Sequence, residues 1–391
     1  MKIAMTKALA APLLVAGVMW ATGAWADDKV LKIGVLSALT GPGSEWGLSQ
    51  DGGAKIVAAE INAKGGLKVG DTTYKIEVIS YDDQYKAALG VSGATRLIEQ
   101  DQVKFIVGPL GSASCLAVKP LYEKNGIIGI LGCWTDKALD ANTKYVFRGN
   151  PTQVEIAGPM VAWLKKNKPS LKTVAEIEPN DETGWASQKL MKEQYEAAGY
   201  KFVASELVER NLKDFQPMLT RILADNPDVI ELATMPAGNA GLVIRQAREL
   251  GFKGQFVKTG GPGAPEIVAV AGKEFSEGII TFIAADHSKP YYKNLEAEYA
   301  AVLKPPMNSF TVNFYDTVHM MFDAMQAAGT VEDTDKVRLA MEKLTPYQGL
   351  QGTIRWGGMK AYGSNHQIEP PFFVGVIKDG EEVAVDRIEL Q

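Results

Sequence analysis

The sequence predicts an α/β protein built from two doubly wound parallel-sheet lobes. Short strand-like runs rich in β-branched residues alternate with segments of helical apolar spacing, as expected for parallel sheets covered on both faces. The alternation restarts after Asn150-Pro151, and two rounds of it imply two lobes. Removing an N-terminal leader of 26 residues from the 391 leaves 365, and about 100–200 residues per domain make two domains the default.

The first round of alternation covers the first third of the chain. Its opening strand, KIGVLSA, is a compact apolar run, and the segment after it carries apolar residues at helical spacing. Strands are expected at 32–38, 74–80, 104–107 and 126–131, and helices at 46–63, 87–100 and 114–124.

The second round of alternation and the C-terminal tail are assigned from the same apolar patterns. A hairpin is expected to close the chain, with Asp379-Gly380 at its turn. Strands are expected at 173–177, 202–208, 229–233, 255–258, 278–282, 373–378 and 382–388, and helices at 159–167, 184–199, 215–225, 240–251, 291–303, 313–328 and 336–344.

The N-terminus predicts export. Lys2 and Lys7 precede an uncharged, mostly apolar run over 8–20, and the small-x-small triplet Ala24-Trp25-Ala26 follows. This order is typical of a secretory signal peptide cut after residue 26. The alternative, a membrane anchor, needs roughly 20 apolar residues. We therefore expect residues 1–26 to be a signal peptide and the mature protein to be soluble outside the cytoplasm.

Composition excludes several function classes. Without the leader, 39 basic and 46 acidic residues remain, and no clustered basic surface of a nucleic-acid binder is evident. Gly-x-Ser-x-Gly, Walker and Gly-x-Gly-x-x-Gly motifs are absent and the three histidines are isolated, so we expect no enzyme and no cofactor. Asp82-Asp83 is interpreted as a strand-end turn rather than a metal pair. Cys115 and Cys133 could form a disulfide in an exported protein or remain as two thiols, but too few ligands accompany them for zinc.

Candidate binding residues lie in the loops that follow the strands. Ligands of open α/β sheets bind beyond the carboxyl ends of the strands, where helix N-termini present free N–H groups. Ser112 and Thr135 could donate a hydrogen bond to an anion there, although helix capping alone would also explain them. The loops concerned are 39–46, 109–114, 132–135, 178–185, 235–236 and 259–262.

Short segments spread in order over essentially the whole mature chain carry a family resemblance. They are 32–35, Thr40-Gly41-Pro42, Trp46-Gly47, Ala54, 61–66, Tyr81-Asp82-Asp83, 106–108, Ser112, Ser114, Tyr122-Glu123, Asp214-Phe215 and 245–248. With these segments the chain resembles the periplasmic leucine/isoleucine/valine-binding type of solute-binding protein, the type I lobed fold. The resemblance implies a periplasmic monomer that hands its ligand to the permease subunits of an ABC importer.

The resemblance also implies three crossover segments and a hinge motion that closes the lobes over the ligand. The crossings should fall near 148–151, 281–284 and 366–371. The first lobe would then comprise residues 27–148 and 283–367, and the second 151–281 and 370–391.

Ligand contacts follow from the same resemblance. In relatives, a serine, a threonine and nearby backbone N–H groups hold the ligand carboxylate, and Ser112 and Thr135 keep that chemistry. The contacts fall on Trp46, Ser112, Cys133, Trp134 and Thr135 in the first lobe and near Thr183, Pro236 and Gly260 in the second.

Two departures from the family pattern bear on the ligand. Gly260 stands where amino-acid-binding relatives carry the carboxylate that holds the ligand ammonium, and a buried ammonium without a counter-charge is expensive. Asp181 or Glu182 could substitute for it. Trp134 stands where relatives carry a small residue, so Trp46 and Trp134 could flank a flat ring. Trp185 could join them, although packing within its own helix would also explain that residue.

These departures predict a small carboxylate ligand without an α-ammonium, foremost an aromatic acid of the benzoate or cinnamate type. The alternatives are a branched-chain amino acid or amide, or the ligand-sensing domain of a receptor. A receptor would normally continue into a membrane span or an effector domain, whereas this chain ends at Gln391. An enzyme with a Rossmann-like lobe is the third class, and the missing motifs count against it.

Overall fold

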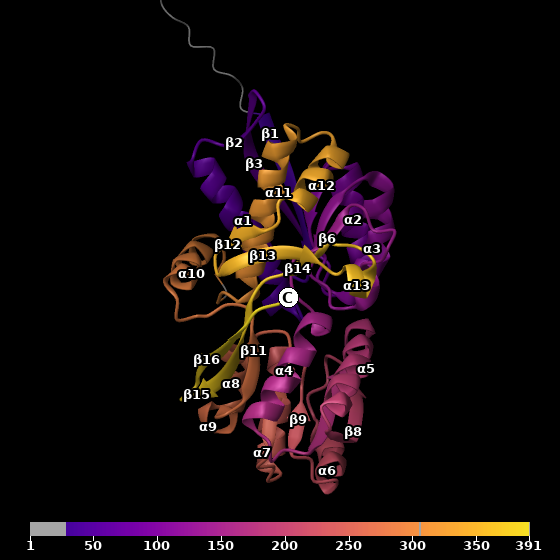
Figure 1. Ribbon diagram of the computed structural model, residues 1–391, viewed down its shortest axis with the longest axis vertical. Coiled ribbons are helices and arrows are strands. Elements are labelled where there is room, and N and C mark those ends of the chain that lie inside the picture. Colours follow the sequence, from indigo (N-terminus) through magenta and orange to yellow (C-terminus); the bar gives the residue numbers. More distant parts are fainter. Residues whose placement is uncertain (1–28, 305, 391) are drawn as a thin grey trace, which may run out of the picture.

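The computed structural model describes residues 29–304 and 306–390. The predicted signal peptide, residues 1–26, lies outside the described residues. Two lobes are stacked along the long axis of the molecule, each with its own sheet and helices (Figure 1). Within the described part of the chain, no helix has the length and apolar character that crossing a membrane requires.

The first lobe is built on a nine-stranded sheet. Five of its strand pairs are parallel and the pairs at both edges are antiparallel. In spatial order the strands are β12 (Tyr347–Gly349), β13 (Gly352–Gly357), β14 (Gln367–Glu369), β6 (Val146–Arg148), β5 (Ile128–Leu131), β4 (Phe105–Val107), β1 (Lys29–Ser37), β3 (Thr72–Asp82) and β2 (Leu67–Val69).

The helices of this lobe come from both ends of the chain. The long helix α11 packs on α1, although more than 240 residues separate them in sequence. The elements are α1 (Ser44–Ala63), α2 (Ala87–Glu99), α3 (Ser112–Asn125), the short 3-10 helix η1 (Asp136–Ala138), α10 (Pro290–Val302), α11 (Phe310–Ala328), α12 (Thr334–Lys343) and α13 (Met359–Tyr362).

The second lobe is built on a seven-stranded sheet with a hairpin at one edge. Its strands, in spatial order, are β16 (Glu381–Ile388), β15 (Phe372–Lys378), β11 (Ile280–Ile283), β10 (Gln255–Lys258), β9 (Val229–Glu231), β7 (Thr173–Pro179) and β8 (Lys201–Val208). Its helices are α4 (Gln153–Asn167), α5 (Glu182–Ala197), α6 (Gln216–Ala224), α7 (Ala237–Glu249), α8 (Ala264–Ala271) and α9 (Lys273–Ser276). The predicted hairpin and its turn are confirmed, with Asp379 and Gly380 both at positive φ.

Burial explains why the inner strands read as continuous apolar runs. Every residue of β4 and β5 is buried, because helices cover both faces of the sheet. The prediction of parallel sheets is correct for these inner strands and incomplete at the edges, where β2, β12, β13, β15 and β16 run antiparallel. These edge pairs make both sheets mixed.

One predicted helix start was wrong for a physical reason. The sequence pattern placed the first helix of the second lobe at 159–167, with Pro159 in its first turn. The structure starts α4 at Gln153, because Thr152 and Glu155 form a reciprocal capping box that satisfies the first free N–H groups. Pro159 lies inside the helix.

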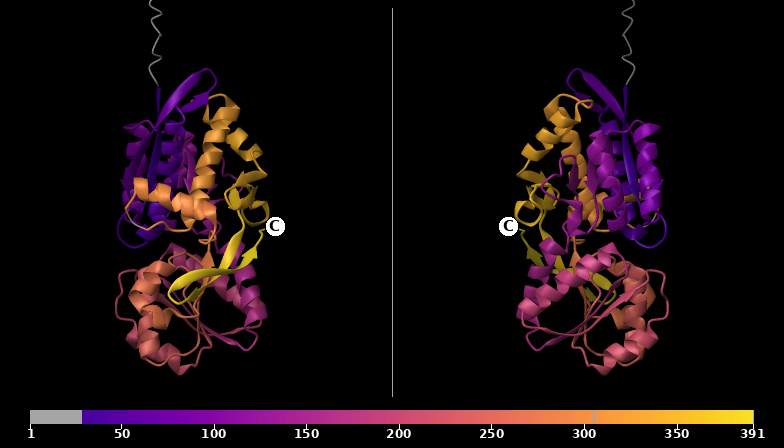
Figure 2. Two further views of the ribbon diagram at one scale, coloured as in Figure 1. Left: turned by 90° about the vertical axis from the view of Figure 1, so that its left-hand side faces the viewer. Right: turned by 90° about the vertical axis from the view of Figure 1, so that its right-hand side faces the viewer.

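Three segments connect the sheets (Figure 2). They run from β6 to α4, from β11 to α10, and from β14 to β15. Strand β11 belongs to the second sheet up to Ile283, and β14 belongs to the first sheet up to Glu369. We therefore propose that the second lobe extends to residue 283 rather than 281, and the first lobe to residue 369 rather than 367.

A buried acid in the first lobe makes stability depend on pH. Asp316 is 3% exposed, and of the residues that the structure describes only Leu350 donates to it, through its backbone N–H. Burial therefore raises the pKa of Asp316 from 3.8 to about 7. A carboxyl whose folded pKa is raised favours the folded state at low pH and loses that advantage as pH rises toward 7. We expect the free energy of unfolding to fall by about 2–3 kcal/mol between pH 5 and pH 8 on account of this group.

The Asp316→Asn variant tests this. Its urea unfolding free energy should decline less than that of the parent between pH 5 and pH 8. Equal declines in the two proteins would contradict the assignment.

Candidate functional site

The candidate site lies between the lobes, where loops following the carboxyl ends of strands in both sheets meet. From the first lobe come the start of α1 with Trp46, the start of α3 with Ser112, and the loop after β5 with Trp134 and Thr135. From the second lobe come the starts of α5 and α7 and the loop after β10. This is the placement that open α/β sheets use for ligands.

Hydroxyl groups bridge the lobes at Ser112. The Ser112 hydroxyl oxygen accepts the backbone N–H of Thr135 at 3.2 Å and the hydroxyl of Thr183 at 2.8 Å. The Thr183 hydroxyl also lies 3.0 Å from the phenol oxygen of Tyr85, a first-lobe residue. All four groups are polar, and the Ser112 and Thr183 side chains are buried between the lobes.

A guanidinium extends this bridge. Arg210, in the loop after β8, lies 4.3 Å from the Tyr85 ring centre and donates to its oxygen at 3.3 Å. Its Nε and Nη2 donate to the Asp181 carboxylate at 2.5 and 3.2 Å, while its buried Nη1 has no hydrogen-bond partner within the described part of the chain. The adjacent ring and carboxylate raise the pKa of Arg210 despite its burial, so it stays cationic.

A second bridge forms around Trp46, which is 4% exposed. Its indole N–H donates to the Pro262 carbonyl at 2.8 Å, and Glu45 beside it accepts the Ala237 N–H at 3.1 Å. Gly261 has φ +57°, and a Cβ there would lie 2.5 Å from the Trp46 ring. Only glycine fits this approach, because the backbone angle and the space both exclude a side chain.

Trp134 and Gly260 form a matched pair across the lobes. A Cβ on Gly260 would lie 2.9 Å from both Cη2 and Cζ3 of Trp134, so the indole fills the space of a side chain at residue 260. Trp134 is 7% exposed and packs on Phe310 with ring centres 6.0 Å apart. The two departures from the family pattern are therefore one structural feature.

The backbone carbonyl groups around Gly260 are hydrogen-bonded within the second lobe. Lys258, 2% exposed, donates from Nζ to the carbonyls of Gly260 at 2.6 Å and Ala233 at 3.2 Å. Burial lowers the pKa of Lys258 to about 8, while burial raises that of Glu178 to about 7. Glu178 accepts hydrogen bonds from Ser187 and Thr234. No carboxylate projects from this wall at residue 260.

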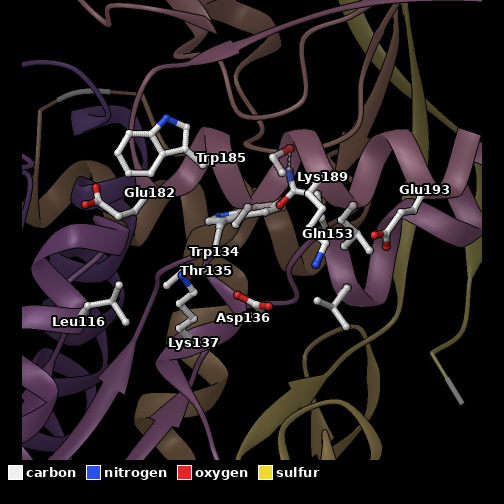
Figure 3. Close-up of a pocket in the computed structure, with 14 residues that line it drawn as sticks. Leu116, Trp134, Thr135, Asp136, Lys137, Gln153, Glu182, Trp185, Lys189 and Glu193 are labelled. Carbon is white, nitrogen blue, oxygen red and sulfur yellow. Dashed lines mark hydrogen bonds between the residues drawn. The ribbon is translucent and has the colours of Figure 1, made fainter. Parts of the chain in front are cut away.

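Open space lies on the other side of Trp134. A cavity of about 580 Å³ separates the two lobes there, within the range of small-molecule sites. Figure 3 shows Trp134 and Thr135 on one wall and α5 with Trp185 and Lys189 on the other. The lining residues are Leu116, Trp134, Thr135, Asp136, Lys137, Gln153, Val154, Glu182, Trp185, Ala186, Ser187, Lys189, Leu190 and Glu193.

The structure brings seven of the eight sequence-predicted site residues to the interface between the lobes and places the eighth, Cys133, in the first-lobe core. Trp134 and Thr135 line the cavity. Ser112, Thr183, Trp46, Pro236 and Gly260 lie deeper, in the parts of the lobes that touch each other directly. Cys133 is buried in the first-lobe core and bonded to Cys115, so its sulfur does not face the cavity.

Sequence reasoning missed Tyr85, Arg210, Lys258 and Gln153. Arg210 follows strand β8, so a survey that included every post-strand loop would have found it. Tyr85 lies two residues after Asp83, in the turn that follows β3. Asp82, the last residue of that strand, accepts hydrogen bonds from Leu39, Thr40 and Gln84. Among the described residues no cluster of metal-ligating side chains occurs.

The disulfide resolves the alternative left open by the sequence. Cys115 in the first turn of α3 is joined to Cys133 in the loop after β5, which closes a loop with a sequence separation of 18. It ties the helix that carries Ser112 to the loop that carries Trp134. Replacing both cysteines by serine is expected to lower the free energy of unfolding by about 3 kcal/mol. Urea titration of the double variant beside the parent under oxidising conditions measures this, and an unchanged midpoint would contradict it.

Two α/β lobes joined by three segments, with polar loops facing each other around a cavity, define a lobed ligand-binding protein. The family model described as "Periplasmic binding protein" matches residues 30–382, and the chain belongs to this family. It is a binding protein and not an enzyme.

Individual relatives agree with this assignment. The chain is 28% identical over 349 residues to the Leu/Ile/Val-binding protein BraC3 of Rhizobium johnstonii, covering 88% of this chain and 91% of that one. The branched-chain amino acid substrate-binding protein of Streptococcus pneumoniae, solved with isoleucine, superposes with a TM-score of 0.79 at 22% identity over 92% of this chain and 100% of that one. A solute-binding protein from R. palustris, solved with benzoate, has a TM-score of 0.78 at 19% identity over 92% of this chain and 97% of that one. The two structural likenesses show the shared fold.

Proposed function

We propose that the mature protein captures a small carboxylate without an α-ammonium, foremost an aromatic acid, by closing its lobes, and delivers it to the permease subunits of an ABC importer in the periplasm. The single observation that carries the ligand class is the Trp134–Gly260 pair. The indole occupies the place where a counter-charge for an ammonium would stand, and it offers an aromatic wall to the cavity.

The polar groups around the cavity support an anionic end on the ligand. Thr135 lines the cavity, and its N–H donates to the Ser112 hydroxyl, which also accepts the Thr183 hydroxyl of the second lobe. A carboxylate could therefore take the place of Thr183 in the contact between the lobes. Deeper between the lobes, Ser112, Thr183 and Tyr85 supply hydroxyl donors, and Arg210 supplies a cation whose buried Nη1 has no hydrogen-bond partner among the described residues. Hydrogen bonds from charged donors to a carboxylate are the strong ones.

The carboxylates near this position are already engaged. Asp181 pairs with Arg210, and Glu45 binds the Ala237 N–H. Glu182 lines the cavity at the start of α5, where it faces solvent in part. Glu178, the buried carboxyl behind the cavity-lining Ser187, already accepts hydrogen bonds from Ser187 and Thr234. An ammonium buried against Trp134 would therefore lack a free, desolvated counter-charge, which is costly.

A branched-chain amino acid is the second candidate, and a specific observation favours it. The curated relatives named for leucine, isoleucine and valine binding share 28% identity over most of the chain. Glu182, Asp136 and Glu193 at the rim of the cavity are the carboxylates that would have to hold the ammonium. A solvated rim position screens such a pair and makes it weak.

The test is a thermal-shift panel on the mature protein, refolded to remove bound ligand, with benzoates, cinnamates, aliphatic carboxylates and branched-chain amino acids. A ligand at 100 times its dissociation constant stabilises the folded state by about 2.7 kcal/mol, which raises the melting temperature measurably. A shift with aromatic acids and none with leucine is the expected result. A shift with leucine alone would overturn the ligand class and leave the amino-acid alternative.

A further inference from the structure

A row of buried carboxyls lies behind the second-lobe wall of the cavity. Glu176 and Glu178 are two residues apart on β7, so their side chains point to the same face of the sheet. Glu231 on β9 is the register partner of Glu176, and all three residues are 0% exposed. The ammonium of Lys258 on β10 and the phenol of Tyr195 on α5 face this row. Burial and the neighbouring carboxyls raise the pKa of Glu176 well above its usual value, so the row does not hold three negative charges.

Glu178 is the member of this row that reaches the cavity, through one side chain. Ser187 on α5 lines the cavity and donates to Glu178 Oε1 at 2.6 Å. Gln153, which also lines the cavity, donates from Nε2 to the Ser187 oxygen at 3.1 Å (Figure 3). The Oε2 atom of Glu178 accepts the backbone N–H of Thr234 at 3.0 Å and its hydroxyl at 2.5 Å. A proton on Glu178 therefore belongs on Oε1, the oxygen that meets Ser187.

The protonation state of Glu178 decides what Ser187 offers to the cavity. A serine hydroxyl has one hydrogen and two acceptor lone pairs. When Glu178 is ionised, that hydrogen is bound to the carboxylate, and the Ser187 oxygen has only a lone pair left for a ligand. When Glu178 is protonated, its O–H donates to Ser187, which already accepts from Gln153, and the serine hydrogen is free to donate into the cavity. Only the protonated state gives an anion a donor at this wall.

A carboxylate in the position proposed above would lie close to Ser187. Thr183 and Ser187 are four residues apart on α5, so they share one face of the helix, with about 5–6 Å between their Cβ atoms. A carboxylate that takes the place of Thr183 beside Ser112 is therefore one helical turn from Ser187. Its charge would also favour the neutral form of Glu178, because like charges in a buried site disfavour each other. Both effects draw a proton onto Glu178 when an acid binds.

We propose that Glu178 is a positioning residue for the acid group of the ligand: its protonated form turns the Ser187 hydroxyl toward the cavity, so that binding of an acid is coupled to uptake of a proton. The proton comes from solvent and forms the O–H bond at Glu178 Oε1. This inference rests on the proposed function, because it describes how the acid proposed there is held.

The ionisation of Glu178 falls in a range where this coupling can be measured. Burial raises its pKa from 4.5 to about 7, although its hydrogen bonds and Lys258 act in the opposite direction. The charges of Glu45 and Arg210 act on this row through Lys258. Above pH 7 the protonated form becomes the minority, and the apparent affinity falls with its fraction. Binding should therefore be strongest below pH 7 and about tenfold weaker at pH 8 than at pH 6.

The experiment is isothermal titration of the ligand-free mature protein with benzoate, which is ionised throughout this pH range. Titrations at pH 7.5 in two buffers of different ionisation enthalpy measure the protons taken up, and titrations at pH 6 and pH 8 measure the change in affinity. We expect the parent to take up more than about half a proton per bound benzoate. Glu178→Gln carries an amide that donates to Ser187 as the protonated acid does. It should therefore bind benzoate equally at pH 6 and pH 8, without proton uptake.

Glu231→Gln is the matched control. Burial raises the pKa of Glu231 to about 7 as well, but its hydrogen-bond donors Tyr195, Thr259 and Leu232 do not line the cavity. This variant should keep the proton uptake of the parent. Should Glu178→Gln not fold, Ser187→Ala removes the connection to the cavity instead, and it should lose most of the tenfold change between pH 6 and pH 8.

The outcomes separate this inference from the proposed function. If benzoate does not bind the parent at any pH between 6 and 8, the proposed function fails and the coupling falls with it. If benzoate binds the parent with equal affinity at pH 6 and pH 8 and without proton uptake, the coupling is overturned while the proposed function stands. The same conclusion follows if Glu178→Gln, or Ser187→Ala in its place, keeps the pH dependence of the parent.

Discussion

Truncation of Trp134 to alanine is expected to weaken the binding of an aromatic acid about 100-fold, which corresponds to about 2.7 kcal/mol. The indole is 7% exposed, lines the cavity and packs on Phe310. Its removal would take away the aromatic wall and open the cavity toward Gly260. Isothermal titration of Trp134→Ala with the tightest-binding aromatic acid measures the loss.

The conservative variant Trp134→Phe is the control for this prediction. It keeps an aromatic face and should retain affinity within about tenfold of the parent. Melting temperatures of both variants separate loss of binding from loss of folding. Parental affinity in a folded Trp134→Ala protein would refute the assignment of the cavity as the ligand site.

Introducing a carboxylate at the inner wall is the second large change. In the parent background, Gly260→Glu should lower the free energy of unfolding by about 1–3 kcal/mol, because its Cβ would meet the Trp134 ring at 2.9 Å and displace the ring from its packing on Phe310. Binding of aromatic acids should be lost with it. Urea unfolding and titration of this variant measure the two effects.

Removing the clash should change the ligand class. The double variant Trp134→Gly, Gly260→Glu frees the space of the indole and places a counter-charge beside it, so we expect leucine to bind where it does not bind the parent. Trp134→Gly alone has the space without the charge and is the matched control. Equal leucine affinity in the double variant and this control would show that residue 260 does not set the preference.

The sequence predicted the alternation of strands and helices well wherever buried apolar runs signal it. The inner strands β4, β5, β9 and β10 fall within one to two residues of their expected positions, because burial on both faces demands continuous apolar residues. Strands β2, β6, β12, β13 and β14 were missed. Four of them have three residues each, too few for a periodic pattern, and β12 has no buried residue. The alternating burial of β13, with Ile354 and Trp356 inside, was overlooked.

For the site, the sequence located the loops and could not decide which side chains touch. Trp134 and Gly260 each drew attention by residue type, but their contact depends on how closely the two lobes approach. The pairing of Cys115 with Cys133 likewise depends on the positions of α3 and the loop after β5. Arg210 reaches Tyr85 across the boundary between the lobes, and no local motif indicates such a contact.

The most direct test of the central claim compares ligands that differ only in the ammonium group. Isothermal titration of the ligand-free mature protein would use 3-phenylpropanoate against phenylalanine, and 4-methylpentanoate against leucine. Each acid should bind at least tenfold more tightly than its amino-acid counterpart, because the wall at Gly260 offers no counter-charge and Lys258 already occupies its carbonyl groups. Tighter binding of phenylalanine and leucine than of the matched acids would contradict the account.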